Sequence, residues 1–243
     1  MRILINLDTA HERRQRMAAQ FAAHGLAFER IGFDGRGLGA AAAAQAVADV
    51  LPGLSFAPRL SGAEIGCWIS HLLAWRRLLA TQGQPACTVV EDDVLLQPEF
   101  EQATARLMQH EIYDVVYLGT SSRNLSTRRQ TRLGPTRLHE PVGAVFHTWG
   151  YVIARRYAQW FFAQPRRLRW PIDHVLGGRV AALKPRLAVL QPAVVDEDPW
   201  SGARSQIEPT TFRLDRVALV ESARRRLLAS RAGDLYYKLY RFL

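Results

Sequence analysis

The sequence predicts an α/β fold with a mostly parallel central sheet. Short apolar runs alternate, through the first half of the chain, with longer segments in which apolar residues recur at helical spacing. The chain has 243 residues, of which 48% are hydrophobic and 22% are charged. This length and composition are typical of a soluble domain with a substantial core, and they exclude a chain that is disordered throughout.

The predicted strands are short runs, most of them apolar, bounded by turn signals or by charged residues. These runs are residues 2–7, 28–31, 86–90, 113–118 and 187–195, and residues 142–154 hold one or two further strands. The predicted helices are residues 10–24, 37–49, 61–81, 98–110, 155–164 and 172–182. The third of these has the clearest start signal, because Ser61 and Glu64 have the spacing of a capping box.

Two polar stretches are predicted to be loops. Residues 120–141 are rich in arginine and lack clear periodicity, which predicts a long surface loop of the kind that often covers a functional site. Residues 197–209 are the second predicted loop. No repeat or clear linker interrupts the chain, so we expect one domain over residues 1–209 and a basic tail over residues 210–243.

The chain is strongly basic, with 32 Lys and Arg residues against 22 Asp and Glu residues and a formal net charge of +10. Half of this excess lies after residue 212. Such a charge suits nucleic acid, an anionic membrane or a phosphorylated substrate as a partner. The tail also has apolar and aromatic residues at near-helical spacing, interleaved with Lys238 and Arg241. This pattern predicts a basic amphipathic helix that either lies on an anionic membrane or docks on the domain.

Other sequence features bear on the cellular compartment. Cys67 and Cys87 are the only cysteines, which excludes a scaffold held together by several disulfides. The longest strongly apolar stretch, residues 142–154, is shorter than the roughly 20 residues of a membrane-spanning helix. Residues 1–7 have no signal-peptide layout. We therefore expect a cytoplasmic protein.

Three consecutive carboxylates, Glu91, Asp92 and Asp93, follow the predicted strand at residues 86–90. Adjacent carboxylates repel one another unless a cation or strong hydrogen-bond donors lie beside them. The strand period places Glu91 and Asp93 on one side and Asp92 on the other. A hard divalent ion such as Mn²⁺ or Mg²⁺ takes oxygen ligands of this kind, at the strand end where α/β sheets bind ligands. The alternative is a solvated acidic turn.

Several short motifs occur in a defined order along the chain. They are Asn6-Leu7-Asp8 followed by Arg13 and Arg16, Asp34-Gly35, Ala63-Glu64-Ile65-Gly66-Cys67 followed by Ser70-His71, Val90-Glu91-Asp92-Asp93, Tyr117-Leu118-Gly119, Gly150-Tyr151-Val152-Ile153, Pro171-Ile172-Asp173 and Ser205-Gln206-Ile207. The ordered set covers residues 1–207 and resembles glycosyltransferase family 25, the bacterial lipooligosaccharide sugar transferases. Ala63 and Val90 are mild departures, where the family usually has Gly and Leu.

The resemblance implies a GT-A-like fold, in which a Rossmann-type nucleotide-sugar-binding half merges with an acceptor half. It implies an inverting transfer of a hexose, most often galactose, from a UDP-sugar to a lipooligosaccharide or LPS-core acceptor. Asp93, with Glu91 or else Asp92, would then hold Mn²⁺ or Mg²⁺, which stabilises charge on the leaving phosphate. Because this acceptor is lipid-linked, the tail would place the protein peripherally at the inner face of the cytoplasmic membrane.

A carboxylate on the acceptor side would act as the base that deprotonates the attacking hydroxyl. The candidate is Asp173, for which a helix N-terminal cap is the alternative role. Three rival carboxylates, Asp196, Glu197 and Asp198, lie later in the chain.

The resemblance places the donor near residues that follow the first strand, the second strand and the acidic triplet, or that lie on the capped helix. They are Asn6, Asp8, Arg13, Asp34, Gly35, Glu64, His71 and Asp92. Simpler roles are open for some of them: Arg13 can lie on a solvated helix side, and Asp34-Gly35 can form only a turn. His71 can be a buried hydrogen-bonding residue. Cys67 is expected to be a small core residue, since no paired base is evident.

Two other functions are alternatives. A different nucleotide-sugar or nucleotidyl transferase could use the same carboxylates, and the donor that it binds would distinguish it. A basic nucleic-acid-binding protein would bind DNA or RNA with a steep salt dependence. No recognised nucleic-acid motif is present, so we expect no nucleic-acid partner.

Overall fold

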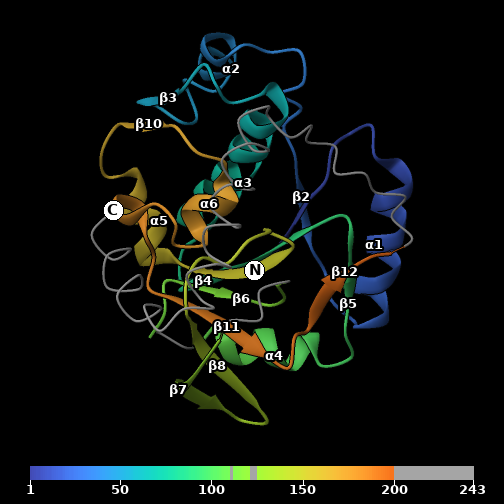
Figure 1. Cartoon of the computed structure of the whole chain (residues 1–243). Helices are drawn as coiled ribbons and strands as arrows, with labels where there is room; N and C mark the ends of the chain where they lie inside the picture. Colours follow the sequence, from blue (N-terminus) through green and yellow to red (C-terminus); the bar gives the residue numbers. More distant parts are fainter. Residues whose placement is uncertain (110–111, 121–124, 200–243) are drawn as a thin grey trace. The chain divides into compact units, whose positions relative to one another are not determined.

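The computed structural model describes residues 1–109, 112–120 and 125–199, and the predicted tail lies outside them. This part of the chain forms an eight-stranded sheet, in which the strands lie in the order β2-β1-β4-β9-β6-β11-β8-β7 (Figure 1). Its strands are β1 (Arg2–Ile5), β2 (Glu29–Ile31), β4 (Ala86–Glu91), β6 (Val115–Tyr117), β7 (Leu125–Leu133), β8 (Thr136–Pro141), β9 (Gly150–Ala154) and β11 (Leu187–Gln191).

Most strands of this sheet run in one direction. β2, β1 and β4 are mutually parallel, and so are β6 and β11. β9 lies between these two groups and is antiparallel to both β4 and β6, so the groups share one direction. At the edge, β8 runs antiparallel to β11 and β7. In the described part of the chain, the prediction of a mostly parallel sheet is thus confirmed.

Helices cover both faces of the sheet, as expected for an α/β fold. α1 (His11–Ala23) and α4 (Phe100–Leu107) pack on one face, in one apolar cluster with β4 residues Ala86 and Val90. α3 (Gly62–Ala80), α5 (Arg155–Phe162) and α6 (Ile172–Leu176) pack on the other face, in a cluster with Cys87 and Val89. Alternate residues of β4 therefore face different helix layers.

The remaining elements are short. They are α2 (Ala40–Ala46), a 3₁₀ turn at Ala181–Leu183, and two small sheets formed by β3 (Leu54–Phe56) with β10 (Arg166–Leu168) and by β5 (Val94–Leu96) with β12 (Val195–Glu197). Within the described ranges, no helix is both long enough and apolar enough to cross a membrane.

α3 begins with the predicted capping box. The Ser61 hydroxyl accepts a hydrogen bond from the backbone N–H of Glu64, and a Glu64 carboxylate oxygen accepts one from the backbone N–H of Ser61 at 2.9 Å. Two free N–H groups of the first turn are satisfied in this way. Further along, Trp68 and Trp75 are fully buried and pack edge to face. The capping box and this apolar side together hold α3 against the sheet.

The prediction of a long loop over residues 120–141 was wrong, because β7 and β8 form a hairpin there. Thr136 and Leu138 are buried, whereas Arg137 between them is exposed. This alternation of buried and exposed residues is not evident in the sequence, because many of the exposed positions are arginine. The pairing of β8 with β11 supplies the burial that makes the hairpin stable.

Two other predicted elements are shorter than expected. The helix predicted over residues 172–182 ends at Leu176, and Gly178 follows with a φ of +80° that a helix cannot continue. The strand predicted over residues 187–195 is interrupted after Gln191, at Pro192, and resumes as β12. Of residues 142–154, only β9 is a strand of the sheet.

Candidate active site

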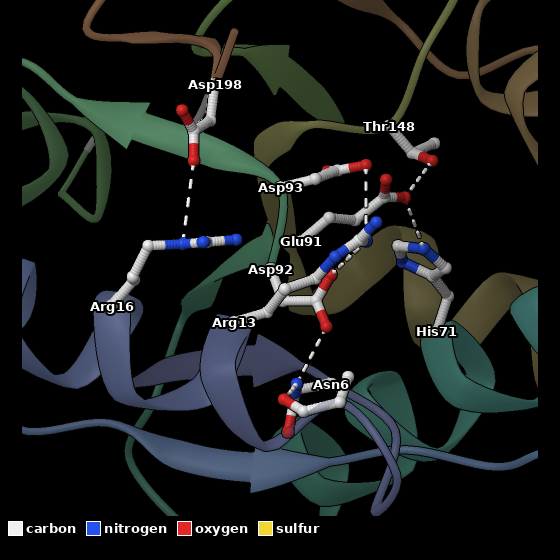
Figure 2. A network of polar contacts seen from close by, with 10 residues as sticks. Asn6, Arg13, Arg16, His71, Glu91, Asp92, Asp93, Thr148 and Asp198 are labelled. Carbon is white, nitrogen blue, oxygen red and sulfur yellow. Dashed lines mark hydrogen bonds and ion pairs between the residues drawn. The ribbon is translucent and has the colours of Figure 1, made fainter. Parts of the chain in front are cut away.

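The acidic triplet Glu91–Asp93 lies at the carboxyl end of β4, next to the carboxyl end of β1 (Figure 2). Asn6 directly follows β1 and is almost fully buried. α1 and α3, which cover opposite faces of the sheet, both contribute side chains to the triplet. The carboxyl ends of parallel strands are where ligands bind in open α/β sheets.

Glu91 and Asp92 point to opposite sides, as the strand period predicts. Glu91 Oε1 accepts hydrogen bonds from His71 Nε2 of α3, at 3.2 Å, and from the hydroxyl of Thr148. Asp92 instead accepts from Asn6 Nδ2 at 2.7 Å and from Arg13 Nη1 of α1 at 3.1 Å. Both carboxylate oxygens of Asp92 are therefore hydrogen-bonded, one to the residue after β1 and one to α1.

The carboxylate of Asp93 has fewer hydrogen-bond partners than those of Glu91 and Asp92. Its Oδ1 is buried without a hydrogen-bond partner in the described part of the chain, and its Oδ2 lies 3.9 Å from Arg13 Nη1. Burial, together with the charges of Glu91 and Asp92, raises the pKa of Asp93 to about 7. The site thus has an excess of negative charge beside an unused carboxylate oxygen, which fits a hard divalent cation.

The pKa of Glu91 moves in the opposite direction. Burial by itself would raise it, but the hydrogen bonds from His71 and Thr148 bring the pKa below its ordinary value. Glu91 is consequently a carboxylate at neutral pH. Its Oε1 carries both of these hydrogen bonds, whereas its Oε2 has no partner among the described residues.

Cys67 lies among carboxylates from several segments. Burial, and then the charges of Glu91, Asp173, Asp93 and Glu64, raise the pKa of the Cys67 thiol well above its usual range. The thiol is therefore protonated, in agreement with the expectation that Cys67 is not a nucleophile. The charge of Asp173 in α6 thus acts on Cys67 together with those of Glu91 and Asp93.

A second set of possible metal ligands overlaps the first. The ligand atoms of Cys67, His71 and Glu91 lie within 4.8 Å of one another. The sulfur and imidazole atoms of this set suit a softer ion than the oxygens of Asp93 and Glu91 do.

Asp173 lies within α6 and not at its N-cap position. The N-cap residue is Pro171, and no side chain caps the helix. Asp173 is half-buried, and its Oδ1 accepts from the backbone N–H of His174 at 2.9 Å. α6 itself packs against α3.

Of the three rival residues, Asp198 contacts the triplet, through its backbone. It is buried, its backbone N–H donates to the carbonyl of Asp93 at 2.9 Å, and its Oδ2 lies 3.8 Å from Arg16 Nε (Figure 2). Asp196 accepts from a side chain outside the triplet, Gln97, at 2.8 Å, and Glu197 is exposed. The pairing of β12 with β5 brings Asp198 here, and no local sequence signal predicts that pairing.

Other predicted donor-binding residues have partners outside the triplet. Asp8 is 86% exposed and pairs with Arg30. Asp34 lies in a turn, where it accepts from the backbone N–H and the guanidinium of Arg36. Gly35 packs on the backbone of Gly66 in α3.

Sequence reasoning missed Thr148 and Tyr151 as site residues. Both lie on the antiparallel segment that enters β9, which contacts β4 only because β9 is inserted between β4 and β6. The Tyr151 hydroxyl contacts His71 Nδ1 at 2.7 Å. A Gly-Tyr motif was visible in the sequence, but nothing local indicated its partner.

A family model described as glycosyltransferase family 25 (LPS biosynthesis protein) matches residues 1–176 of this chain. The matched range includes the acidic triplet, His71 and Asp173. It therefore contains the groups that the structure gathers around Cys67.

Curated relatives carry glycosyltransferase names. Lacto-N-neotetraose biosynthesis glycosyltransferase LgtB of Neisseria meningitidis serogroup B is 33% identical over 188 residues, which are 70% of this chain and 65% of that protein. Lacto-N-neotetraose biosynthesis glycosyltransferase LgtE of Neisseria gonorrhoeae is 34% identical, over 65% of this chain and 58% of that protein. Procollagen galactosyltransferase 1 of Danio rerio is 30% identical, over 71% of this chain and 30% of that protein. The chain thus spans less than two thirds of each relative.

Proposed function

The chain belongs to glycosyltransferase family 25, and from this premise we propose that it transfers a hexose from a UDP-sugar to a lipooligosaccharide or LPS-core acceptor. Galactose is the proposed hexose, in keeping with the galactosyltransferase among the relatives. The LgtB and LgtE relatives act, by their names, in the assembly of an oligosaccharide.

One observation carries the proposal: two carboxylates at the carboxyl end of β4 each have an oxygen without a partner among the described residues. Asp93 has a buried, unpartnered oxygen, and Glu91 has one unpartnered oxygen as well. These two residues would hold Mn²⁺ or Mg²⁺, which would supply positive charge to the diphosphate of the donor. The backbone of Asp198 adjoins Asp93, while its carboxylate pairs with Arg16.

The residues around the triplet would bind and orient the donor. Asn6 and Arg13 are held by Asp92, and the Oδ1 atom of Asn6 is buried without a partner among the described residues. A donor group with an N–H or O–H would satisfy that oxygen. In this proposal Asp92 orders the donor pocket through Asn6 and Arg13.

Asp173 is the proposed base. It would accept the proton of the acceptor hydroxyl while the hydroxyl oxygen bonds to the anomeric carbon and the bond from that carbon to the UDP oxygen breaks. A single displacement of this kind inverts the anomeric configuration. The electrostatic contact of Asp173 with Cys67, beside Glu91 and Asp93, supports this role. Asp198 is the alternative base.

The test is a transfer assay with purified protein, a panel of UDP-hexoses and a lipooligosaccharide that lacks its terminal hexose. We expect UDP-galactose to be the preferred donor, EDTA to abolish transfer, and Asp173→Asn to lower kcat by at least about 100-fold. Asp196→Asn is the matched control, because Asp196 is exposed and bonded to Gln97 outside the triplet. Full transfer in EDTA would refute the requirement for a metal ion. Retention of the anomeric configuration would refute the single displacement.

We also propose that the protein lies peripherally at the inner face of the cytoplasmic membrane, through the basic tail at residues 210–243. Flotation with anionic and with neutral vesicles tests this. Deletion of the tail should reduce binding to anionic vesicles more than it reduces transfer to a soluble acceptor. An equal loss of both would indicate a tail that docks on the domain.

A further inference from the structure

A chain of hydrogen bonds runs from the core behind the site to Glu91. The indole N–H of Trp75 donates to the Tyr151 hydroxyl oxygen at 3.0 Å, and that hydroxyl lies 2.7 Å from His71 Nδ1. His71 Nε2 lies 3.2 Å from Glu91 Oε1. Trp75, Tyr151 and His71 are all fully buried, so none of these polar atoms can exchange its partner for bulk water.

The chemistry of the two ends determines where the protons lie. An indole N–H can only donate, so the Tyr151 oxygen accepts from Trp75 and its own hydrogen is directed to His71 Nδ1. At the other end, the Glu91 carboxylate can only accept, so His71 Nε2 carries a hydrogen. Taken together, the two ends place a hydrogen on His71 Nε2 and a lone pair on Nδ1.

Other protonation states of His71 leave a buried group unsatisfied. If Nδ1 carried a hydrogen, the Tyr151 oxygen would accept twice and its own hydrogen would have no acceptor in the described part of the chain. A metal on Cys67, His71 and Glu91 that bound His71 through Nε2 would need the lone pair of that nitrogen, and it would force that same arrangement. An unsatisfied buried donor is costly, so the hydrogen-bond chain disfavours this softer metal set.

Resting on the proposed function of Glu91 as a metal ligand, we propose that Tyr151 and Trp75 are positioning residues that direct the His71 Nε2–H to Glu91. His71 and Thr148 both donate to Oε1, which fixes the plane of the carboxylate and leaves Oε2 for the ligand (Figure 2). Buried partners that orient a metal-binding side chain in this way commonly change metal affinity or activity by about 10- to 100-fold when they are removed.

The first test needs no enzyme activity. With ¹⁵N-labelled histidine, NMR of the full-length protein should show His71 with a protonated Nε2 and an unprotonated, hydrogen-bonded Nδ1; loss of these signals in His71→Asn assigns them. In Tyr151→Phe the Nδ1 resonance should move toward that of a nitrogen without a hydrogen bond. A protonated Nδ1 in the unmodified protein, or an unchanged Nδ1 resonance in Tyr151→Phe, would overturn the proposal.

The second test separates positioning from loss of core stability. Tyr151→Phe should raise the Mn²⁺ concentration for half-maximal transfer by about 10-fold or more, and Trp75→Phe should change it less and in the same direction. The matched control is Tyr157→Phe, which removes a buried hydroxyl that donates to the Leu183 carbonyl at 2.7 Å. An equal metal requirement in Tyr151→Phe and the control would contradict the proposal.

The two tests also keep this inference distinct from the proposed function. If the unmodified protein transfers no hexose, the proposed function fails, and the His71 resonances still decide whether the hydrogen-bond chain sets the tautomer. If transfer occurs normally and Tyr151→Phe leaves both readouts unchanged, the positioning role fails and the proposed function stands.

Discussion

Asp93→Asn should abolish transfer and at the same time stabilise the metal-free protein. The folded state holds Asp93 with an unpartnered buried oxygen beside two other carboxylates, and the pKa of Asp93 is raised from its ordinary 3.8 to about 7. The unfolded chain has no such penalty. An amide of the same shape removes the charge that the fold disfavours and removes a proposed metal ligand.

The size of this gain follows from the two pKa values. Because the folded-state pKa of Asp93 is the higher one, the folded protein binds more protons than the unfolded chain between about pH 4 and 7, so the free energy of unfolding falls as pH rises through that range. The shift of about three pKa units corresponds to about 4 kcal/mol at about pH 8. The same linkage leaves less than about 1 kcal/mol at about pH 4.

Urea denaturation in EDTA, at about pH 8 and about pH 4, measures this effect. Asp92→Asn is the matched control, since Asp92 accepts hydrogen bonds from Asn6 and Arg13, and its replacement should destabilise the protein by about 1–3 kcal/mol. The neighbouring substitutions are thus expected to have opposite signs at about pH 8. An Asp93→Asn variant that is less stable there, or whose gain does not depend on pH, would refute the reasoning.

Two further predictions concern packing and thiol reactivity. Gly66→Ala should lower the free energy of unfolding by about 1–3 kcal/mol in urea denaturation. The reason is that the added Cβ would lie 2.6 Å from the backbone N of Gly35 and 2.9 Å from the carbonyl oxygen of Phe33. An unchanged stability would show that the turn containing Phe33 and Gly35 moves freely. Both thiols should react slowly with a thiol reagent at about pH 8 until urea unfolds the protein. Burial raises the pKa of Cys87 to about 12, and burial together with nearby carboxylates raises the pKa of Cys67 well above its usual range. Rapid labelling of the folded protein would contradict these shifts.

Much of the fold could be predicted from local pattern. The short apolar runs identified β1, β2, β4 and β6, and the Ser61–Glu64 spacing identified the start of α3. The hairpin β7–β8 could not be predicted, because most of its outward-facing positions are arginine and its stability comes from pairing with β11. Burial by a distant strand leaves no periodic signal of its own in such a short segment.

For the site, the sequence by itself determined the acidic triplet at a strand end and the opposite directions of Glu91 and Asp92, since both follow from the strand period. Only the tertiary structure decided what meets those carboxylates. Insertion of β9 beside β4 brings Thr148 to Glu91 and Tyr151 to His71, and pairing of β12 with β5 brings Asp198 to Asp93. These contacts join residues far apart in the chain, and strand pairing across such distances is set by burial in the whole fold, which local periodicity does not encode.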